Sequence, residues 1–162
     1  MIYMQNMQLH DIDKIDRAIL RVLQKDGRLS NVQLADRVGL SESACLRRVR
    51  LLEQSGIIDR YVMLINQAAI GKPGNVFVRV TLDGQQKEKL QQFEKAVVAV
   101  PEVMECYLMS GDFDYLLRVI IKDNSDYMRV HDKLTGLPGV LRVQSSFALR
   151  TVRKTTELAL DN

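Results

Sequence analysis

The sequence has few of the residues on which disulfide scaffolds and metal centres depend. Its 162 residues include only two cysteines, Cys45 and Cys106, and only two histidines, His10 and His131. Two cysteines cannot build a disulfide framework, and with these histidines they form no recognisable zinc motif. We therefore interpret both cysteines as small core residues, and we expect neither a metal nor a cofactor.

Long apolar runs and a strong charge of one sign are also missing. No stretch approaches the roughly 20 apolar residues that span a bilayer, and the opening stretch MIYMQNMQLH has neither a basic region nor a cleavable hydrophobic one. We expect a cytoplasmic protein with no membrane partner. The net charge is only +3, and residues 10–60 hold ten Lys and Arg against eight Asp and Glu. Nucleic-acid binding must therefore be argued from where the charges point.

The first part of the chain has the pattern of a small helical domain. Apolar residues recur with helical spacing through residues 12–23. Ser30 and Gln33 have the spacing of a capping box at the start of a second helix, and Gly39 supplies a left-handed turn before a third. This succession predicts a helix-turn-helix, in a domain that we place at residues 10–60.

The third predicted helix carries three arginines in the stretch SESACLRRVR. On a helical wheel, Cys45, Val49 and Leu52 form one apolar side. The opposite, polar side consists of Ser43, Arg47, Arg50 and Gln54, with Arg48 at its flank. Such a helix is either a solvated surface helix or a recognition helix for the DNA major groove, and the capped helix and tight turn before it favour the second.

The chemistry of these side chains suggests a role for each in DNA binding. Arginine can donate two parallel hydrogen bonds to guanine, whereas an arginine at the flank more often contacts phosphate. We predict that Ser43, Arg47 and Arg50 contact base edges and that Gln54 and Arg48 lie nearer the backbone. Ser30 and Asn31, at the start of the preceding helix, complete the predicted DNA-binding set.

The helical domain is followed by a segment of different composition. The run IIDRYVMLIN is rich in β-forming residues, and GKPGN marks a turn. We assign residues 61–75 to a β-strand and linker.

The second half of the chain is an internal repeat with an offset of 37 residues. Val80 corresponds to Leu117, and Pro101 corresponds to Pro138, each proline standing shortly before a predicted strand. Two copies of strand–helix–strand give the ferredoxin-like βαββαβ motif. The predicted fold class is therefore α+β.

We place the ferredoxin-like domain at residues 76–152 and a C-terminal tail at residues 153–162. The predicted helices cover one face of its sheet, and the other face carries Phe77, Leu116 and Ile120. Because this face is too apolar to leave in water, we expect a second copy of the chain to cover it.

The two repeats are joined by the stretch SGDFDY, a predicted hairpin loop that turns at Gly111. Its carboxylates, Asp112 and Asp114, have three interpretations: catalysis or metal binding, ordinary turn chemistry, or recognition of a small zwitterion through an ammonium contact. No nucleophile, base or further metal ligand converges on them in the sequence, so we do not expect an enzyme.

Four stretches resemble one known family of proteins. DRAILRVLQKDGRLSNVQLADRVGLS, CLRRVRLLEQSGII, SGDFDYLL and LPGV are similar to the Lrp/AsnC bacterial transcriptional regulators, also called feast/famine regulatory proteins. The resemblance extends from Ile12 to about Leu158. It implies an N-terminal DNA-binding domain and a C-terminal effector domain, in homodimers that assemble further, often to octamers.

The resemblance also implies an amino-acid effector bound between dimers. The family's effector loop corresponds to Gly111, Asp112, Phe113, Asp114 and Tyr115, with contacts from the neighbouring dimer at His131, Leu137 and Gly139. His131 taken alone is more often a surface or half-buried helix residue. Leu108, Phe113 and Leu137 suggest an apolar lining and hence a medium-sized hydrophobic amino acid.

Two other classes of function remain open at this stage. An amino-acid-sensing protein that acts only through protein partners would not need the arginine face of the third helix. A small amino-acid-metabolising enzyme would need converging catalytic groups, which the sequence does not offer.

Overall fold

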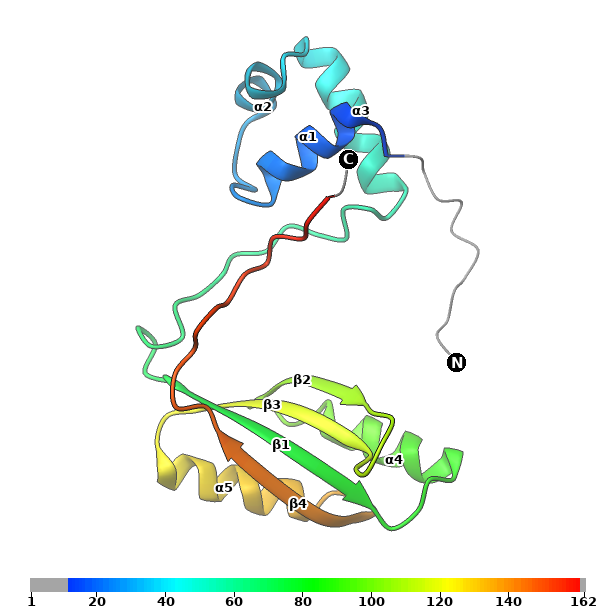
Figure 1. Cartoon of the computed structure of the whole chain (residues 1–162), viewed down its shortest axis with the longest axis vertical. Coiled ribbons are helices and arrows are strands. Elements are labelled where there is room, and N and C mark those ends of the chain that lie inside the picture. Colours follow the sequence, from blue (N-terminus) through cyan, green and yellow to red (C-terminus); the bar gives the residue numbers. More distant parts are fainter. Residues whose placement is uncertain (1–11, 161–162) are drawn as a thin grey trace. The chain divides into compact units, whose positions relative to one another are not determined.

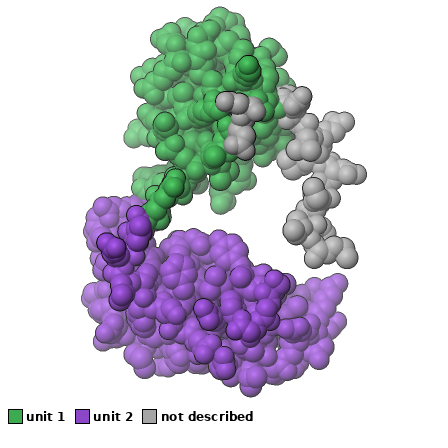
Figure 2. Space-filling model, in the orientation of Figure 1, with its two compact units in different colours: residues 1–64, 153–162 green, residues 65–152 purple. Residues whose placement is uncertain are grey.

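The computed structural model describes residues 12–160, and these residues fold into two compact units. One unit contains the chain up to Leu64 together with the segment from Arg153 onward, and the other is Ile65–Val152 (Figure 2). Residues 10, 11, 161 and 162, which we assigned to the first domain and the tail, lie outside the described residues, as does the stretch MIYMQNMQLH.

The first unit is built from three helices, α1 (Lys14–Leu23), α2 (Asn31–Val38) and α3 (Glu42–Gln54) (Figure 1). The predicted capping box is confirmed, since Ser30 and Gln33 each accept the other's backbone N–H. Gly39 ends α2 in the left-handed conformation at φ 69°, which a residue with a Cβ adopts only with strain. These two local signals place α3 directly after α2.

The interior of this unit is a small apolar core. Its buried members come from all three helices and are Ile19, Leu20, Leu34, Ala35, Cys45 and Leu52. Cys45 and Leu52 are fully buried and Val49 packs beside them, so the predicted inner side of α3 is confirmed. The opposite side of α3 is therefore turned to solvent.

The second unit is a four-stranded antiparallel sheet with two helices. Its elements in chain order are β1 (Gly74–Leu82), α4 (Lys87–Val97), β2 (Val103–Leu108), β3 (Tyr115–Ile121), α5 (Asn124–Thr135) and β4 (Val140–Phe147). The strand order is β2-β3-β1-β4, which is the predicted βαββαβ arrangement. Val78 of β1 lies opposite Leu117 of β3 on one side and opposite Ser145 of β4 on the other.

Both helices of this unit pack on the same face of the sheet. Alternate residues of β1 and β3, such as Val78 and Leu117, are fully buried against Phe93 of α4 and Val130 of α5. The opposite face carries Phe77, which is 40% exposed, and the half-buried Leu116 and Ile120. One face is therefore closed by helices and the other is open in the single chain.

The segment between the units does not form the strand that we predicted within residues 61–75. Residues 57–73 contain no strand, and pairing begins only at Gly74. The β-rich run Tyr61–Ile65 is exposed throughout, because no other described segment pairs with it and a lone strand leaves its backbone groups unsatisfied. None of the described helices is both long enough and apolar enough to cross a membrane.

Candidate functional sites

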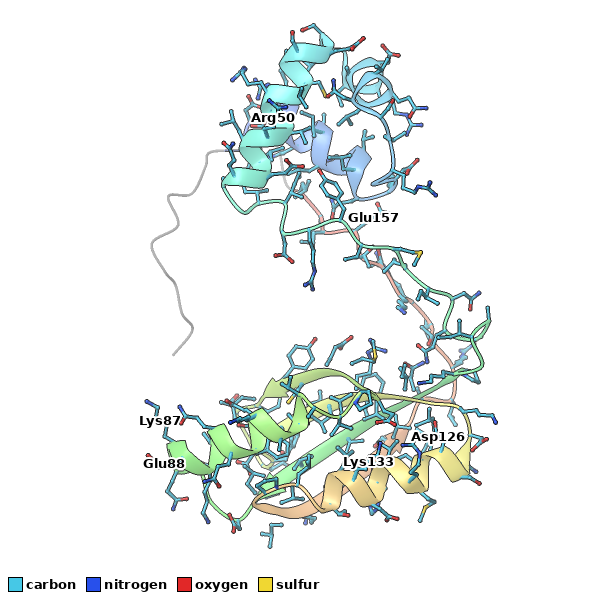
Figure 3. All side chains as sticks on the ribbon, turned by 180° about the vertical axis from the view of Figure 1, so that it is seen from behind. Arg50, Lys87, Glu88, Asp126, Lys133 and Glu157 are labelled. Atoms are coloured by element: carbon cyan, nitrogen blue, oxygen red, sulfur yellow. The ribbon has the colours of Figure 1, made fainter. Side chains whose placement is uncertain are left out.

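The outward side of α3 forms a shallow polar hollow. The residues lining it are Ser43, Leu46, Arg47, Arg50, Leu51 and Gln54. Four of these six are the residues that the helical wheel placed on the polar side. All four are exposed, and Arg50 is labelled on α3 in Figure 3.

Neither Arg47 nor Arg50 has a hydrogen bond or ion pair with any residue in the described part of the chain. An arginine that is fully charged and has no internal partner keeps all five of its N–H donors available to a ligand. This face of α3 can therefore present two guanidinium groups, a hydroxyl and an amide to a DNA groove.

Arg48 has internal partners, unlike the two arginines on either side of it. Its Nη1 lies 2.7 Å from Asp13 Oδ2 and 2.8 Å from Asp16 Oδ1, so it ties α3 to the start of α1. The Asp16 side chain is only 4% exposed, and a buried carboxylate is costly unless it is paired. Arg48 therefore links α3 to α1, and its predicted contact with the DNA backbone stays a prediction.

The contacts among Asp13, Asp16 and Arg48 shift the pKa values of Asp13 and Arg48. The backbone hydrogen bond from Asp16 to Asp13, followed by the hydrogen bond and charge of Arg48, lowers the pKa of Asp13. The hydrogen bond to Asp16, and then the one to Asp13, raises the pKa of Arg48. Both groups stay ionised near neutral pH, so the cluster acts as a permanent link between α1 and α3.

The two predicted contacts on α2 also have internal partners. Ser30 caps α2 within its capping box, and the Asn31 amide donates to the Glu42 carbonyl at 2.8 Å. Asn31 therefore holds the start of α2 against the start of α3. Ser30 thus stabilises the start of α2, and Asn31 links α2 to α3.

In the second unit, three loops meet at the end of the sheet where β1 stops. The β2–β3 loop is joined to the β1–α4 loop because Asp114 accepts from the Leu82 backbone N–H and from Gln85 Nε2, each at 2.7 Å. The β1–α4 loop is joined in turn to the α5–β4 loop by Asp83 N–H, which donates to the Gly139 carbonyl at 2.8 Å. The predicted effector loop thus lies in the same loop cluster as Gly139.

Two residues of the predicted effector loop point into the protein. Asp114 is 5% exposed and both its carboxylate oxygens are used by the hydrogen bonds above. Tyr115 is 1% exposed, stacks on Phe93 with ring centroids 4.5 Å apart and donates its hydroxyl to Glu94. Burial, and then that hydrogen bond, raises the pKa of Tyr115. Asp114 and Tyr115 therefore hold the loop in place, and their predicted part in effector binding stays a prediction.

The remaining loop residues are accessible. Gly111 has φ 140° and Asp112 is exposed. The Phe113 ring is half-buried, 5.3 Å from the guanidinium carbon of Arg79, and Leu108 at the end of β2 is 59% exposed. These residues present backbone N–H groups, a free carboxylate and apolar surface together.

The residues predicted to contact a neighbouring dimer lie on and after α5. Leu137 packs partly against the core, and Gly139 has φ 72°. His131 is half-buried with its ring 5.8 Å from that of Tyr127. The described residues contain no group of three His, Cys, Asp or Glu side chains that could hold a metal ion.

The sequence analysis missed the partners that position these sites. Asp13 and Asp16 anchor Arg48, and Gln85 anchors Asp114. Asp13 and Asp16 stand three apart on one face of α1, which is a local signal for a charged contact. Gln85 gives no comparable signal, because a glutamine in a polar loop has no preferred partner.

Comparison with known proteins places both units in described families. A family described as winged helix-turn-helix DNA-binding matches residues 12–59, and the Lrp/AsnC ligand binding domain matches residues 75–158. The leucine-responsive regulatory proteins of Klebsiella pneumoniae and of Escherichia coli strain K12 are each 43% identical over 151 residues, covering 93% of this chain and 92% of theirs.

Solved structures agree with these matches. An AsnC family transcriptional regulator from Agrobacterium tumefaciens is 39% identical, with a TM-score of 0.87, over 91% of this chain and 96% of that chain. A transcriptional regulator from Neisseria meningitidis in complex with L-Met has the same identity and TM-score, over 92% of this chain and 97% of that one. A feast or famine regulatory protein from M. tuberculosis complexed with L-methionine is 31% identical, with a TM-score of 0.79, over 91% and 98%.

A helix-turn-helix with an open polar helix face, joined to a ferredoxin-like ligand domain, defines a ligand-responsive DNA-binding regulator and not an enzyme. The chain belongs to the Lrp/AsnC family of transcriptional regulators.

Proposed function

We propose that this regulator reads DNA through Ser43, Arg47 and Arg50 and changes its DNA binding when a hydrophobic amino acid occupies the loop cluster of the second unit. The observation that carries the proposal is the contrast between adjacent arginines. Arg48 is bonded to two aspartates, whereas Arg47 and Arg50 are exposed and have no partner among the described residues. A helix that is anchored on one side leaves its other side rigid and available.

In this mechanism α3 enters the major groove. Arg47 and Arg50 donate to guanine O6 and N7, Ser43 adapts to neighbouring edges, and Gln54 lies near the backbone. Ser30 is exposed at the start of α2, where it can contact phosphate while it caps the helix. Asn31 acts indirectly by holding α3 in place.

A second copy is the proposed cover of the open sheet face. Phe77, Leu116 and Ile120 form an apolar patch on it, beside the charged pair of Arg118 and Glu105 at 2.7 Å. Two copies related by a twofold axis would set two α3 helices about 34 Å apart along DNA, one helical turn. Further association of dimers to an octamer, in the cytoplasm where the DNA is accessible, completes the proposed assembly.

The proposed effector is a hydrophobic amino acid of the size of leucine or methionine. The loop offers backbone N–H groups near Gly111 for the carboxylate, the Asp112 carboxylate for the ammonium, and Leu108 and Phe113 for the side chain. Leu137, Gly139 and His131 of a neighbouring dimer would close the site. Relatives named leucine-responsive and the two methionine complexes support this choice.

The test is DNA binding by an Arg47→Ala variant. Fluorescence anisotropy with a duplex from upstream of the protein's own gene should show wild-type binding that weakens steeply with salt. Arg47→Ala should cost about 1–3 kcal/mol and relax base preference at one position. Lys87→Ala, which removes an exposed cation from α4 in the other unit, is the charge-matched control and should bind as the wild type does. Equal affinities for all three proteins would refute the assignment of α3.

The alternative function is an amino-acid sensor that acts only through protein partners. It predicts that both L-leucine and L-methionine can bind while no duplex binds at any salt concentration.

A further inference from the structure

The segment Arg153–Leu160 leaves the sheet unit and docks on the helical unit. The side-chain amide of Gln24 makes two hydrogen bonds to one residue of this segment: its Oε1 accepts from Leu158 N–H at 2.6 Å and its Nε2 donates to the Leu158 carbonyl at 3.2 Å. Arg21 Nη2 donates to the Leu160 carbonyl at 2.8 Å. The end of α1 therefore holds an extended chain by its backbone.

One apolar side chain adds to these contacts. Leu160 is partly buried and packs against the core of the helical unit, whereas Leu158 is 74% exposed. The segment, in which Figure 3 labels Glu157, contains no helix or strand. The internal hydrogen bond recorded within the segment, from Glu157 N–H to Thr155 Oγ1 at 3.1 Å, is local. The position of the segment on α1 therefore depends on its contacts with Gln24, Arg21 and the apolar core, which must offset the entropy lost on ordering it.

The docking changes how the two units are connected. The chain passes from the helical unit to the sheet unit at Leu64 and returns at Arg153, so two covalent connections join them. A domain on a single flexible linker reorients freely. The returning segment, held at its end by Gln24, is a second physical link between the two units.

We propose that Arg153–Leu160 is a strap whose docking on α1 of its own chain carries the amino-acid response from the ligand domain to the helix-turn-helix. The coupling rests on the proposed function, whereas the docking does not. If the strap is released, the ligand domain can still bind its effector and α3 can still bind DNA. The effect of one on the other should then be lost, because allosteric coupling needs a physical link whose state both sites influence.

The first experiment measures docking by hydrogen exchange on the full chain. The Leu158 amide should exchange at least roughly tenfold faster in Gln24→Ala than in the wild type, because the substitution removes its acceptor. Leu160→Ser should also speed exchange of the Leu158 amide, because it removes the apolar side chain that packs the segment against the core of the helical unit. Gln91→Ala, at an exposed glutamine of α4, is the matched control and should leave the Leu158 amide unchanged. Unchanged exchange within α1, α2 and α3 shows that the helical unit remains folded.

The second experiment measures coupling on the same variants. The affinity for the duplex upstream of the gene is compared without amino acid and with L-leucine or L-methionine. We expect the wild type and Gln91→Ala to respond, and Gln24→Ala and Leu160→Ser to bind the duplex with little or no response.

Each outcome decides a separate statement. Exchange at Leu158 that is equally fast in wild type and variants would overturn the docking. Faster exchange together with a full wild-type response would overturn the coupling. A wild type that responds to neither amino acid would count against the proposed effector and the coupling alike, while the exchange data still decide whether the strap docks.

Discussion

Replacement of Arg48 by alanine should weaken the helical unit and not its contact with DNA. The guanidinium bonds Asp16 at 2.8 Å and Asp13 at 2.7 Å. In the variant Asp16, whose side chain is 4% exposed, loses the guanidinium group that pairs with it. Asp13 is 48% exposed, so water replaces most of what it loses and it adds little.

The size of the effect follows from the buried member of the cluster. Breaking a buried ion pair costs about 3–5 kcal/mol, and a hydrogen bond to a charged group is worth about 1.5–3 kcal/mol. Because the Arg48 side chain is 22% exposed, the smaller value for a hydrogen bond to a charged group applies. We expect the free energy of unfolding to fall by about 2–3 kcal/mol. For a domain of this size, that corresponds to a fall in Tm of roughly 10–20 °C.

The assay is calorimetry of the full chain together with DNA binding at a temperature where the variant is folded. Arg47→Ala makes the same chemical change one position away and is the matched comparison. It should keep the wild-type Tm and lose DNA affinity, whereas Arg48→Ala should lose stability and keep affinity. A wild-type Tm for Arg48→Ala, or equal losses of affinity in both variants, would refute the reasoning.

The remaining predictions concern the second unit. Asp112→Ala should abolish the response to amino acid and leave DNA binding intact, and wild-type effector affinity by calorimetry would contradict the loop assignment. Asp114→Ala should instead destabilise the unit by about 2–3 kcal/mol, because the Leu82 amide is left buried without an acceptor; an unchanged Tm would argue against it. Burial raises the pKa of Glu102, but hydrogen bonds from Arg129 and Lys133 outweigh it, so that its pKa is lowered from 4.5. The ionised Glu102 side chain thus stabilises the protein above about pH 4.5, and this stabilisation is lost as the pH falls below that value. In Glu102→Gln, Tm should therefore depend less on pH in this range.

Local and periodic features made much of the fold predictable. The capping box at Ser30, the left-handed turn at Gly39 and the apolar side of α3 each depend on residues a few positions apart. The repeat in the second half predicted the βαββαβ succession of elements because two similar halves can share one core only in a few ways. The open face of the sheet followed from simple alternation along β1.

The parts that were not predicted depend on contacts between residues far apart in the chain. Arg48 meets Asp16 across 32 positions, and Gln24 meets Leu158 across 134. The wheel shows that Arg48 lies at a flank, but not that a carboxylate lies beside it. Asp114 lies at the end of a loop of suggestive composition and Tyr115 begins β3, and only the folded chain shows that both turn inward.

Different positions of α3 hold the helix in its unit and face solvent, and this has a consequence for how the DNA sequence preference of such a regulator can change. Positions 45, 48 and 52 hold the helix in place, whereas positions 47 and 50 make no recorded anchoring contact and position 43 contacts only the Ser41 hydroxyl, at 3.4 Å. Substitutions at the second set can retarget the protein to new operators while the architecture stays intact. A combinatorial library at these three positions should therefore yield mostly folded proteins with altered sequence preference.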